Sequence, residues 1–295
     1  MNNYIKETYK PYRFTIKGKC LIINTTSGSF VIKHEDKDIK KLFNYLKSRG
    51  FYNYPRINDG PRPDEIVYEY LEDNYLPNEQ KGLDLANLVS VLHHKTTFYK
   101  EVTQDKYNNI YENIKSNIEY LDAYYHNEYQ RMFKEVYHSP SHYLFVINYS
   151  KIKKSLDFCG RELESWYQLV KDKTSQRVAL VHNNLSLNHY IKNDNEYLIS
   201  WEKYKIDTPV LDLVKFYQNN YLDLSFDSIL AKYLGNYPWQ EDEKKLFNIL
   251  KALPPKIEFD KLTEFKQTQV IREKLDYIFK TEKLIRPDNS AKEEK

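Results

Sequence analysis

Two stretches decide the fold of this 295-residue chain, Val181-His182-Asn183-Asn184-Leu185-Ser186-Leu187-Asn188-His189 and Leu198-Ile199-Ser200-Trp201-Glu202. Each belongs to a short apolar segment next to polar residues, Arg177 to Val181 for the first and Glu196 to Trp201 for the second, and such segments predict strands. Asn193-Asp194-Asn195 between them is a hairpin signal. We therefore expect the two stretches to lie at the two ends of one hairpin.

The length and composition limit the class of protein. A chain of 295 residues can form one large domain or two lobes with a well-buried core. Cys20 and Cys159 are far apart, so no disulfide framework is expected. No segment has the pattern of an N-terminal leader or the length of a membrane span, and the most apolar stretch runs only from Tyr143 to Tyr149. These absences predict a cytoplasmic protein without a membrane partner.

The charge pattern argues against a nucleic-acid partner. Its 45 basic and 42 acidic residues are interleaved along most of the chain and give a net charge of +3. A nucleic-acid surface would gather its basic residues on one face, so the only feature in favour of this alternative is mild basicity. The 28 tyrosines could stack on bases. We favour a codon bias toward A and T instead, because Lys, Asn and Ile are abundant as well.

The first part of the chain has the pattern of a small antiparallel sheet. Apolar residues alternate or cluster from Tyr12 to Lys33 around a turn at Thr25 to Ser29. Asp36 to Arg49 has helical spacing, and Gly50 follows where a helix would stop. A further short strand is expected from Ile66 to Leu71. The apolar face of the predicted helix is formed by Ile39, Leu42, Phe43 and Leu46.

Beyond Pro77 the pattern becomes helical. One apolar stripe runs from Leu85 to Leu92 and another from Tyr107 to Tyr125, and we interpret both as core faces. Thr208 followed by Pro209 has the pattern of an N-cap and a first helical residue. We divide the chain into a β-rich lobe with a hinge at 1–72, a helical lobe at 73–286 and a disordered tail at 287–295.

In this order the elements resemble the aminoglycoside-phosphotransferase branch of the kinase-like fold, and within it the spore-coat-associated members of low-GC Gram-positive bacteria. His182 to His189 resembles the catalytic loop His-x-Asp-x-x-x-x-Asn. Leu198 to Glu202 resembles the strand end hydrophobic-Ile-Asp-Trp-Glu, and Asp207 to Leu213 resembles Asp-x-Pro-x-x-Asp-Leu. The resemblance covers nearly the whole chain. It implies an α+β fold of two lobes, a small antiparallel-sheet lobe and a larger, mainly helical lobe.

The resemblance also shows that the chemical positions are altered. Asn184 stands in place of the aspartate that accepts a proton, and an amide cannot do so near neutral pH. Ser200 replaces the aspartate that holds magnesium, although magnesium binding typically relies on carboxylates. His189 stands where the family has asparagine, and Asn188 comes one residue early. We therefore expect a pseudokinase that transfers no phosphoryl group.

Other positions that match the family are those that contact the nucleotide or brace the catalytic loop. His182 and Asp212 resemble residues that brace the catalytic loop and the following helix. Lys33 resembles the strand lysine that contacts phosphates, but the helix from Asp36 to Arg49 contains no glutamate to hold it. The hinge residues Glu69 and Leu71 complete the expected nucleotide contacts, which we predict to be weak and independent of magnesium.

These positions predict a catalytically inactive binding or scaffold module with a protein partner, a spore-coat component by resemblance, and without a cofactor or metal. The alternative is an active small-molecule or sugar kinase that uses ATP and magnesium with a displaced acid, Glu202 or Asp194. If Ser200 to Glu202 is extended, both side chains point to the same side, so Glu202 could reach a metal. Against this alternative, loss of a general base typically lowers the rate by about 10²- to 10⁴-fold.

Overall fold

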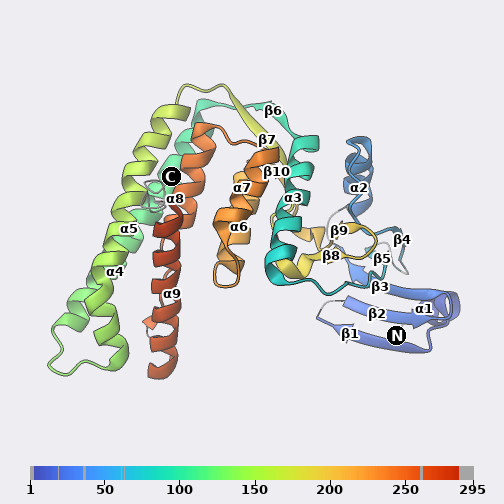
Figure 1. Ribbon diagram of the computed structural model, residues 1–295, viewed down its shortest axis with the longest axis horizontal. Coiled ribbons are helices and arrows are strands. Elements are labelled where there is room, and N and C mark those ends of the chain that lie inside the picture. Colours follow the sequence, from blue (N-terminus) through green and yellow to red (C-terminus); the bar gives the residue numbers. More distant parts are fainter. Residues whose placement is uncertain are drawn as a thin grey trace, which may run out of the picture.

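The structure is a computed structural model that describes residues 3–18, 20–35, 38–60, 62, 64–259 and 262–285. The predicted tail, 287–295, lies outside the described residues. Figure 1 shows a sheet region at the N-terminal end and a larger helical region that includes a long pair of helices, α4 and α5. The predicted α+β fold, with its antiparallel sheet and larger helical part, is confirmed.

The N-terminal sheet is antiparallel with strand order β1-β2-β3-β5-β4. One face carries the small core formed by Ile23, Ile32 and Val67, which Ile5 of the helix α1 (Asn3–Tyr9) covers. The opposite face lies toward the helical region. The strands are β1 (Arg13–Lys17), β2 (Cys20–Thr25), β3 (Gly28–His34), β4 (Ile57–Asp59) and β5 (Glu65–Glu69).

The helix after this sheet, α2 (Ile39–Ser48), is close to its prediction. Asp38 caps it by accepting a hydrogen bond from the amide of Lys41 at 2.9 Å, so the helix begins at Ile39. The helix stops before Gly50, whose φ of +71° is a left-handed conformation that glycine adopts without strain. The predicted apolar face is confirmed as buried, namely Ile39, Leu42, Phe43 and Leu46. Asp36, the predicted first residue, lies outside the described residues.

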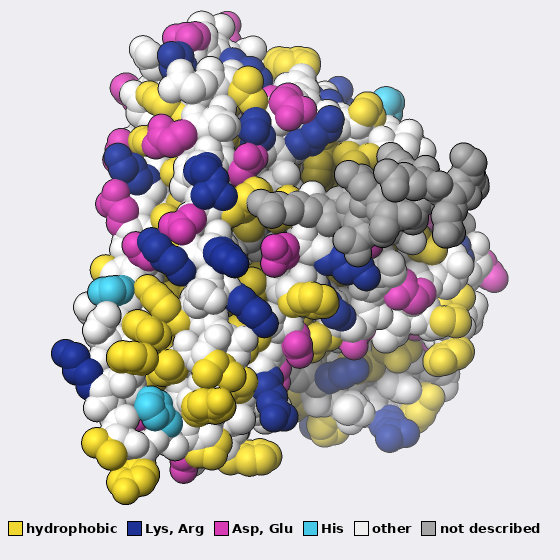
Figure 2. Space-filling model, turned by 60° about the vertical axis from the view of Figure 1, so that its left-hand side comes forward, with side chains coloured by type: hydrophobic (Ala, Val, Ile, Leu, Met, Phe, Trp, Pro, Cys, Tyr) yellow, Lys and Arg dark blue, Asp and Glu magenta, His cyan; other side chains and the backbone are white. Residues whose placement is uncertain are grey.

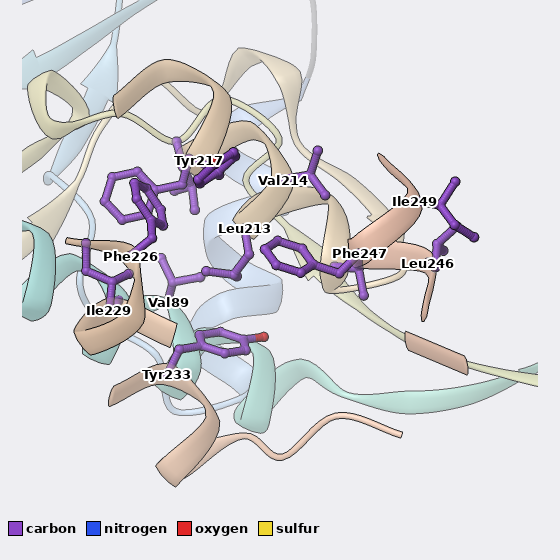
Figure 3. Packing of buried hydrophobic residues seen from close by; sticks show 14 of the residues in the cluster. Val89, Leu213, Val214, Tyr217, Phe226, Ile229, Tyr233, Leu246, Phe247 and Ile249 are labelled. Atoms are coloured by element: carbon purple, nitrogen blue, oxygen red, sulfur yellow. The ribbon is translucent and has the colours of Figure 1, made fainter. Parts of the chain in front are cut away.

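The helical region surrounds a three-stranded sheet of order β10-β7-β6. Its main core joins helices from distant parts of the chain, and Figure 3 shows Leu213, Tyr217, Phe226, Tyr233 and Phe247 packed together. The bounds are α3 (Asn78–Thr96), β6 (Phe98–Glu101), α4 (Gln104–Phe133), α5 (Pro140–Val170), β7 (Ser175–Val181), β10 (Lys205–Asp207), α6 (Val210–Asn220), α7 (Phe226–Asn236), α8 (Glu241–Ala252) and α9 (Glu264–Ile285).

The central hairpin differs from the prediction. The strand that ends at Val181, β7, pairs with β6 and β10 and not with the segment after Asn195. That segment forms β9 (Glu196–Leu198), which pairs with the short strand β8 (Tyr190–Lys192). The predicted strand from Arg177 to Val181 and the turn at Asn193 to Asn195 are therefore confirmed, and the pairing of that strand across the turn is wrong. A strand as short as β8 is too brief for an alternating pattern to identify it.

Candidate functional site

The predicted site residues meet at a cavity of about 580 Å³ between the N-terminal sheet and the helical region. A smaller cavity of about 280 Å³, between α4, α8 and β7, contains none of them. We therefore take the larger cavity as the candidate site. Its walls come from the sheet, from residues 69 to 73 and from the segment after β7, and they include Lys33, Tyr68, Glu69, Leu71, Asn188, His189 and Ser200.

Lys33 and Ser200 face each other across this cavity. The ammonium group of Lys33 is 3.4 Å from the hydroxyl oxygen of Ser200 and 5.7 Å from the ring centre of Tyr68. Within the part of the chain that the structure describes, no carboxylate lies within ion-pair distance of Lys33. The lysine thus contacts a neutral hydroxyl and an aromatic ring, and the hydroxyl of that ring donates to the carboxylate of Glu35 at 2.6 Å.

The backbone conformation of Ser200 determines the direction of the Glu202 side chain. Ser200 has φ of 66° and ψ of 55°, a left-handed conformation, and a short turn, η2 (Trp201–Lys203), follows it. Ser200 to Glu202 is therefore not extended, which corrects the geometry on which rescue of a metal by Glu202 depended. Glu202 is exposed and does not line the cavity. Asp194, the other displaced acid, is exposed at the turn between β8 and β9 and does not line it either.

The loop after β7 presents two of its three predicted residues to the cavity. Asn188 and His189 line it, whereas Asn184 is half-buried behind them. His189 donates a hydrogen bond from Nδ1 to the carbonyl oxygen of Asn184 at 2.6 Å. This bond leaves Nε2 as the ring nitrogen with a lone pair when the imidazole is neutral. The side chain of Asn219 holds the loop from α6 by donating to the carbonyl of Leu185 at 2.9 Å.

Asp212 lies at the centre of a fully buried polar network beneath this loop. Its carboxylate accepts hydrogen bonds from the backbone amides of His182 at 2.8 Å and Asn183 at 2.6 Å. His93 adds its Nε2 at 3.0 Å, and the hydroxyl of Tyr233 lies 2.7 Å from the other nitrogen of that ring. Asn183 has φ of 57°, which lets two successive amides reach one carboxylate. The network fixes the backbone where the loop begins.

His182 joins the two sequence motifs. Its Nε2 donates to the carbonyl oxygen of Ile199 at 2.9 Å, and its ring packs edge-on against Trp201 with centres 4.8 Å apart. Burial lowers the pKa of His182 below its ordinary value of 6.5, since a charged ring would lose its hydration. Trp201 in turn donates to the carbonyl of Leu198 at 2.8 Å. The loop and the segment that carries Ser200 are therefore fixed relative to each other.

Sequence reasoning missed several residues of this site. His93 left a weak signal, because it is a polar residue beside a core stripe of α3. Tyr233 left none, because its contact with His93 spans 140 residues. Lys17 could have been found, since β1 and β2 place it opposite Cys20, which lies opposite Lys33. Tyr68 belongs to the strand predicted from Ile66 to Leu71, and the strand pattern alone gives no sign of a site.

Comparison with known proteins supports the fold and not more. No protein-family model matches the sequence, and no curated protein is similar to it in sequence. Among solved structures, an aminoglycoside phosphotransferase from Alicyclobacillus acidocaldarius superposes with a TM-score of 0.69 at 8% identity, over 96% of this chain and 94% of that one. The chain has the aminoglycoside-phosphotransferase fold.

Two further structures share this fold. The AMP-bound spectinomycin phosphotransferase has a TM-score of 0.58 at 11% identity, with 97% of this chain and 98% of that chain covered. A choline kinase from Streptococcus pneumoniae has a TM-score of 0.50 at 16% identity, again over 97% and 98% of the two chains. Identities this low identify the aminoglycoside-phosphotransferase fold alone.

Ser200 does not fit the magnesium ion that the fold family implies, and the two acids that line the cavity, Glu69 and Asp73, accept backbone amides. Magnesium requires oxygen donors, including one or two carboxylates. Ser200 offers a neutral hydroxyl and stands beside the ammonium group of Lys33. Among the described residues no group of three or more His, Cys, Asp or Glu side chains could hold a metal.

No helix in the same part of the chain has the length and apolar character to cross a bilayer.

Proposed function

We propose that this protein binds a ligand in the cavity between its two regions, transfers no phosphoryl group and acts as a binding or scaffold module. The observation that carries the proposal is the contact between the Lys33 ammonium and the Ser200 hydroxyl, where no acid of the described residues pairs with Lys33. At this position the family resemblance places the carboxylate that holds magnesium. A lysine without that carboxylate attracts an anion, but it cannot hold a metal.

The chemistry of phosphoryl transfer explains why turnover is not expected. The reaction depends on metal ions that neutralise the phosphates and on a group that orients or deprotonates the nucleophile. Asn184 does not line the cavity, and its amide is no base. His189 does line it and keeps a lone pair on Nε2 when neutral. That base alone is insufficient, because the charge on the phosphates would still lack its metal.

The test is a phosphoryl-transfer assay on the full chain with ATP and magnesium, using water, amino alcohols and aminoglycosides as acceptors. We expect no transfer by the unmodified protein above a control without protein. Loss of the base alone lowers rates by about 10²- to 10⁴-fold, so turnover near the kinase range of about 1–100 s⁻¹ would refute the proposal. A His189→Ala variant would then show whether His189 is the base of an active kinase. Transfer that appears only in Asn184→Asp plus Ser200→Asp would support a degraded site.

A scaffold module needs a surface that binds a protein partner, and the hairpin of α4 and α5 offers one. Around its tip, five large apolar side chains are exposed, from 54% at Ile147 to 92% at Tyr137. Figure 2 shows hydrophobic side chains gathered at the lower end of the face that includes this hairpin. Exposed aromatic residues are typical of protein interfaces. The tip residues are Phe133, Val136, Tyr137, Tyr143 and Ile147.

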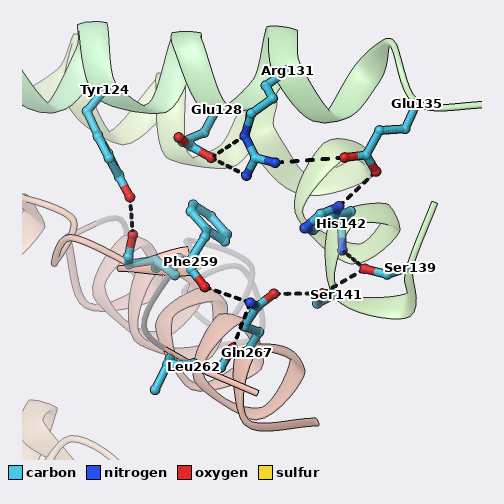
Figure 4. Close-up of polar contacts among 11 residues, drawn as sticks. Tyr124, Glu128, Arg131, Glu135, Ser139, Ser141, His142, Phe259, Leu262 and Gln267 are labelled. Carbon is cyan, nitrogen blue, oxygen red and sulfur yellow. Dashed lines mark hydrogen bonds and ion pairs between the residues drawn. The ribbon is translucent and has the colours of Figure 1, made fainter. Parts of the chain in front are cut away.

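Polar contacts hold this tip in place (Figure 4). Arg131 pairs with Glu128 at 2.7 Å, and Glu135 accepts a hydrogen bond from His142 at 2.8 Å. On the other side, the Ser141 hydroxyl donates to Gln267 of α9 at 3.0 Å. A surface fixed in this way loses little conformational entropy when a partner binds. We therefore propose the hairpin tip as the partner surface.

A spore coat as the location of that partner rests on the family resemblance. It is tested by measuring how much of the protein stays with the coat fraction of spores, for the unmodified chain and for Val136→Ser plus Tyr137→Ser. We expect the substitutions to release the protein into the soluble fraction. The proposal fails for this surface if retention is unchanged, and for the coat if the unmodified chain is not retained.

A further inference from the structure

We infer that the cavity takes a metal-free ligand that carries both a planar ring and phosphate groups, and that magnesium opposes its binding. The inference rests on the proposed function, because a working phosphotransferase would need the metal. In an active site of this fold the metal joins the phosphates to protein carboxylates. Here the corresponding position holds a hydroxyl and an ammonium group. We therefore expect magnesium to weaken the binding of the ligand instead of strengthening it.

The first argument is the row of side chains on the sheet face above the cavity. Lys17 lies opposite Cys20 on the next strand, and Cys20 lies opposite Lys33 on the strand after that. Directly opposite residues share one face of a sheet, and adjacent strands are about 4.8 Å apart. Both lysines line the cavity, so two positive charges stand on the same wall.

The acids of the cavity do not neutralise this wall. Asp73 forms an ion pair with Lys81 at 2.6 Å and also accepts the backbone amide of Lys192 at 2.9 Å. Glu69 accepts the backbone amide of Arg56 at 2.9 Å. Lys33, by contrast, contacts the Ser200 hydroxyl and the Tyr68 ring, and Glu35 accepts its hydrogen bond from the Tyr68 hydroxyl at 2.6 Å. The wall therefore attracts an anion directly.

The second argument is the shape and lining of the rest of the cavity. Ile22 and Val31 line it from the sheet, and Ile191 and Ile199 line it from the segment around β8 and β9. We call this apolar part of the cavity the slot, because apolar side chains from two regions suit contact with a flat ring. The volume of about 580 Å³ is within the usual range for small-molecule sites. A ligand that places a ring in the slot and phosphate groups at the lysines is a nucleotide.

The third argument concerns what magnesium does to such a ligand. The ion binds the same phosphate oxygens that Lys33 would contact, and it cancels two of their negative charges. It also adds a positive charge beside the ammonium group of Lys33, and the two charges repel each other. The neutral hydroxyl of Ser200 is a poor magnesium ligand and does not offset this repulsion. Magnesium therefore competes with Lys33 for the phosphates instead of joining them to the protein.

The experiment is calorimetric titration of the full chain with ATP, in EDTA and in saturating magnesium, with adenosine as the probe for the slot. For the unmodified protein we expect ATP to bind at least about tenfold more weakly with magnesium, and more tightly than adenosine in EDTA. In EDTA, the Lys33→Met variant should bind ATP no more tightly than adenosine, and the Lys33→Arg variant should still bind ATP more tightly than adenosine. Ser200→Asp should invert the effect, so that magnesium strengthens ATP binding. Circular dichroism melts confirm that each variant is folded.

The outcomes separate this inference from the proposed function. If magnesium strengthens ATP binding to the unmodified protein and no phosphoryl group is transferred, the inference is wrong and the proposed function stands. If ATP does not bind in either condition, or binds no better than adenosine, the inference is also wrong. If magnesium strengthens binding and transfer follows, both are wrong.

Discussion

Two polar clusters contrast sharply, one beneath the loop after β7 and one at the wall of the cavity. The buried cluster around Asp212 gives that carboxylate three hydrogen-bonding neighbours, two backbone amides and His93. At the cavity wall, Lys33 contacts the hydroxyl of Ser200, and no acid of the described residues pairs with it. The first cluster fixes the shape of the loop, and the second is where chemistry would occur. The contrast supports the proposal that this protein keeps the framework of the fold without the groups that transfer a phosphoryl group.

The largest effect is expected when the framework cluster is broken. Asp212→Ala leaves two buried amides and His93 without their acceptor, so we expect the free energy of unfolding to fall by about 3–5 kcal/mol. Urea denaturation monitored by circular dichroism measures this change. The matched control is Asp194→Asn at the exposed turn, where the change should stay within about 0.5 kcal/mol. Equal effects at the two positions would contradict the contrast.

A pH dependence tests the same cluster through His182. Burial lowers the pKa of His182 below 6.5, so the unfolded chain takes up the proton first as the pH falls. The stability is therefore fully present above about pH 6.5 and is lost below it, by at most about 1.4 kcal/mol per pH unit for one proton. His182→Gln keeps an N–H donor but does not titrate.

The measurement for His182 is the free energy of unfolding between pH 5 and 7 for both proteins. Carboxylates titrate in each of them, so the informative quantity is the difference between the two slopes. The unmodified protein should have the steeper slope. If the slopes are equal, His182 does not resist protonation and the account of the buried cluster is wrong.

A smaller effect is expected at the cavity wall itself. Ser200 adopts a left-handed backbone conformation, which costs a non-glycine residue about 1–2 kcal/mol. Ser200→Gly removes this strain but adds freedom to the unfolded chain, so we expect a net gain of about 0.5–1 kcal/mol. Thermal and urea unfolding measure it. A loss of stability would mean that the hydroxyl supports the fold, which would erase the distinction between the two clusters.

The smallest effect is expected at the hairpin tip. Tyr137→Ser removes a side chain that is 92% exposed, so the free energy of unfolding should change by less than about 0.5 kcal/mol. Urea denaturation checks this prediction too. A larger loss would show that the tip is part of the core and not a surface kept for a partner.

The sequence predicted the fold where local patterns are strong. The apolar face of α2 and the stop at Gly50 follow from helical spacing and glycine geometry, and the structure has both. It failed at the central hairpin, because β8 is too short to show a pattern. It also left open whether Ser200 to Glu202 is extended, since the left-handed turn at Ser200 leaves no sequence signal when the residue is not glycine.

For the site, the motifs identified residues but not their partners. Lys33 and Ser200 were each singled out from the sequence, yet only the structure shows that they face one another from 167 positions apart. His93 and Tyr233 complete the buried cluster through contacts that depend on helix packing, which one sequence does not encode locally. The charge of the cavity wall needed the sheet register, because that register places Lys17 and Lys33 on the same face of the sheet, two strands apart.

Divalent-ion binding tests the central claim most directly. Electron paramagnetic resonance of manganese, titrated with the unmodified protein and ADP, distinguishes an ion held by the protein from one held by ADP alone. We expect the spectrum of manganese with ADP to be unchanged by the unmodified protein and to be altered by the Ser200→Asp variant. A new protein-bound manganese signal with the unmodified chain would contradict the account.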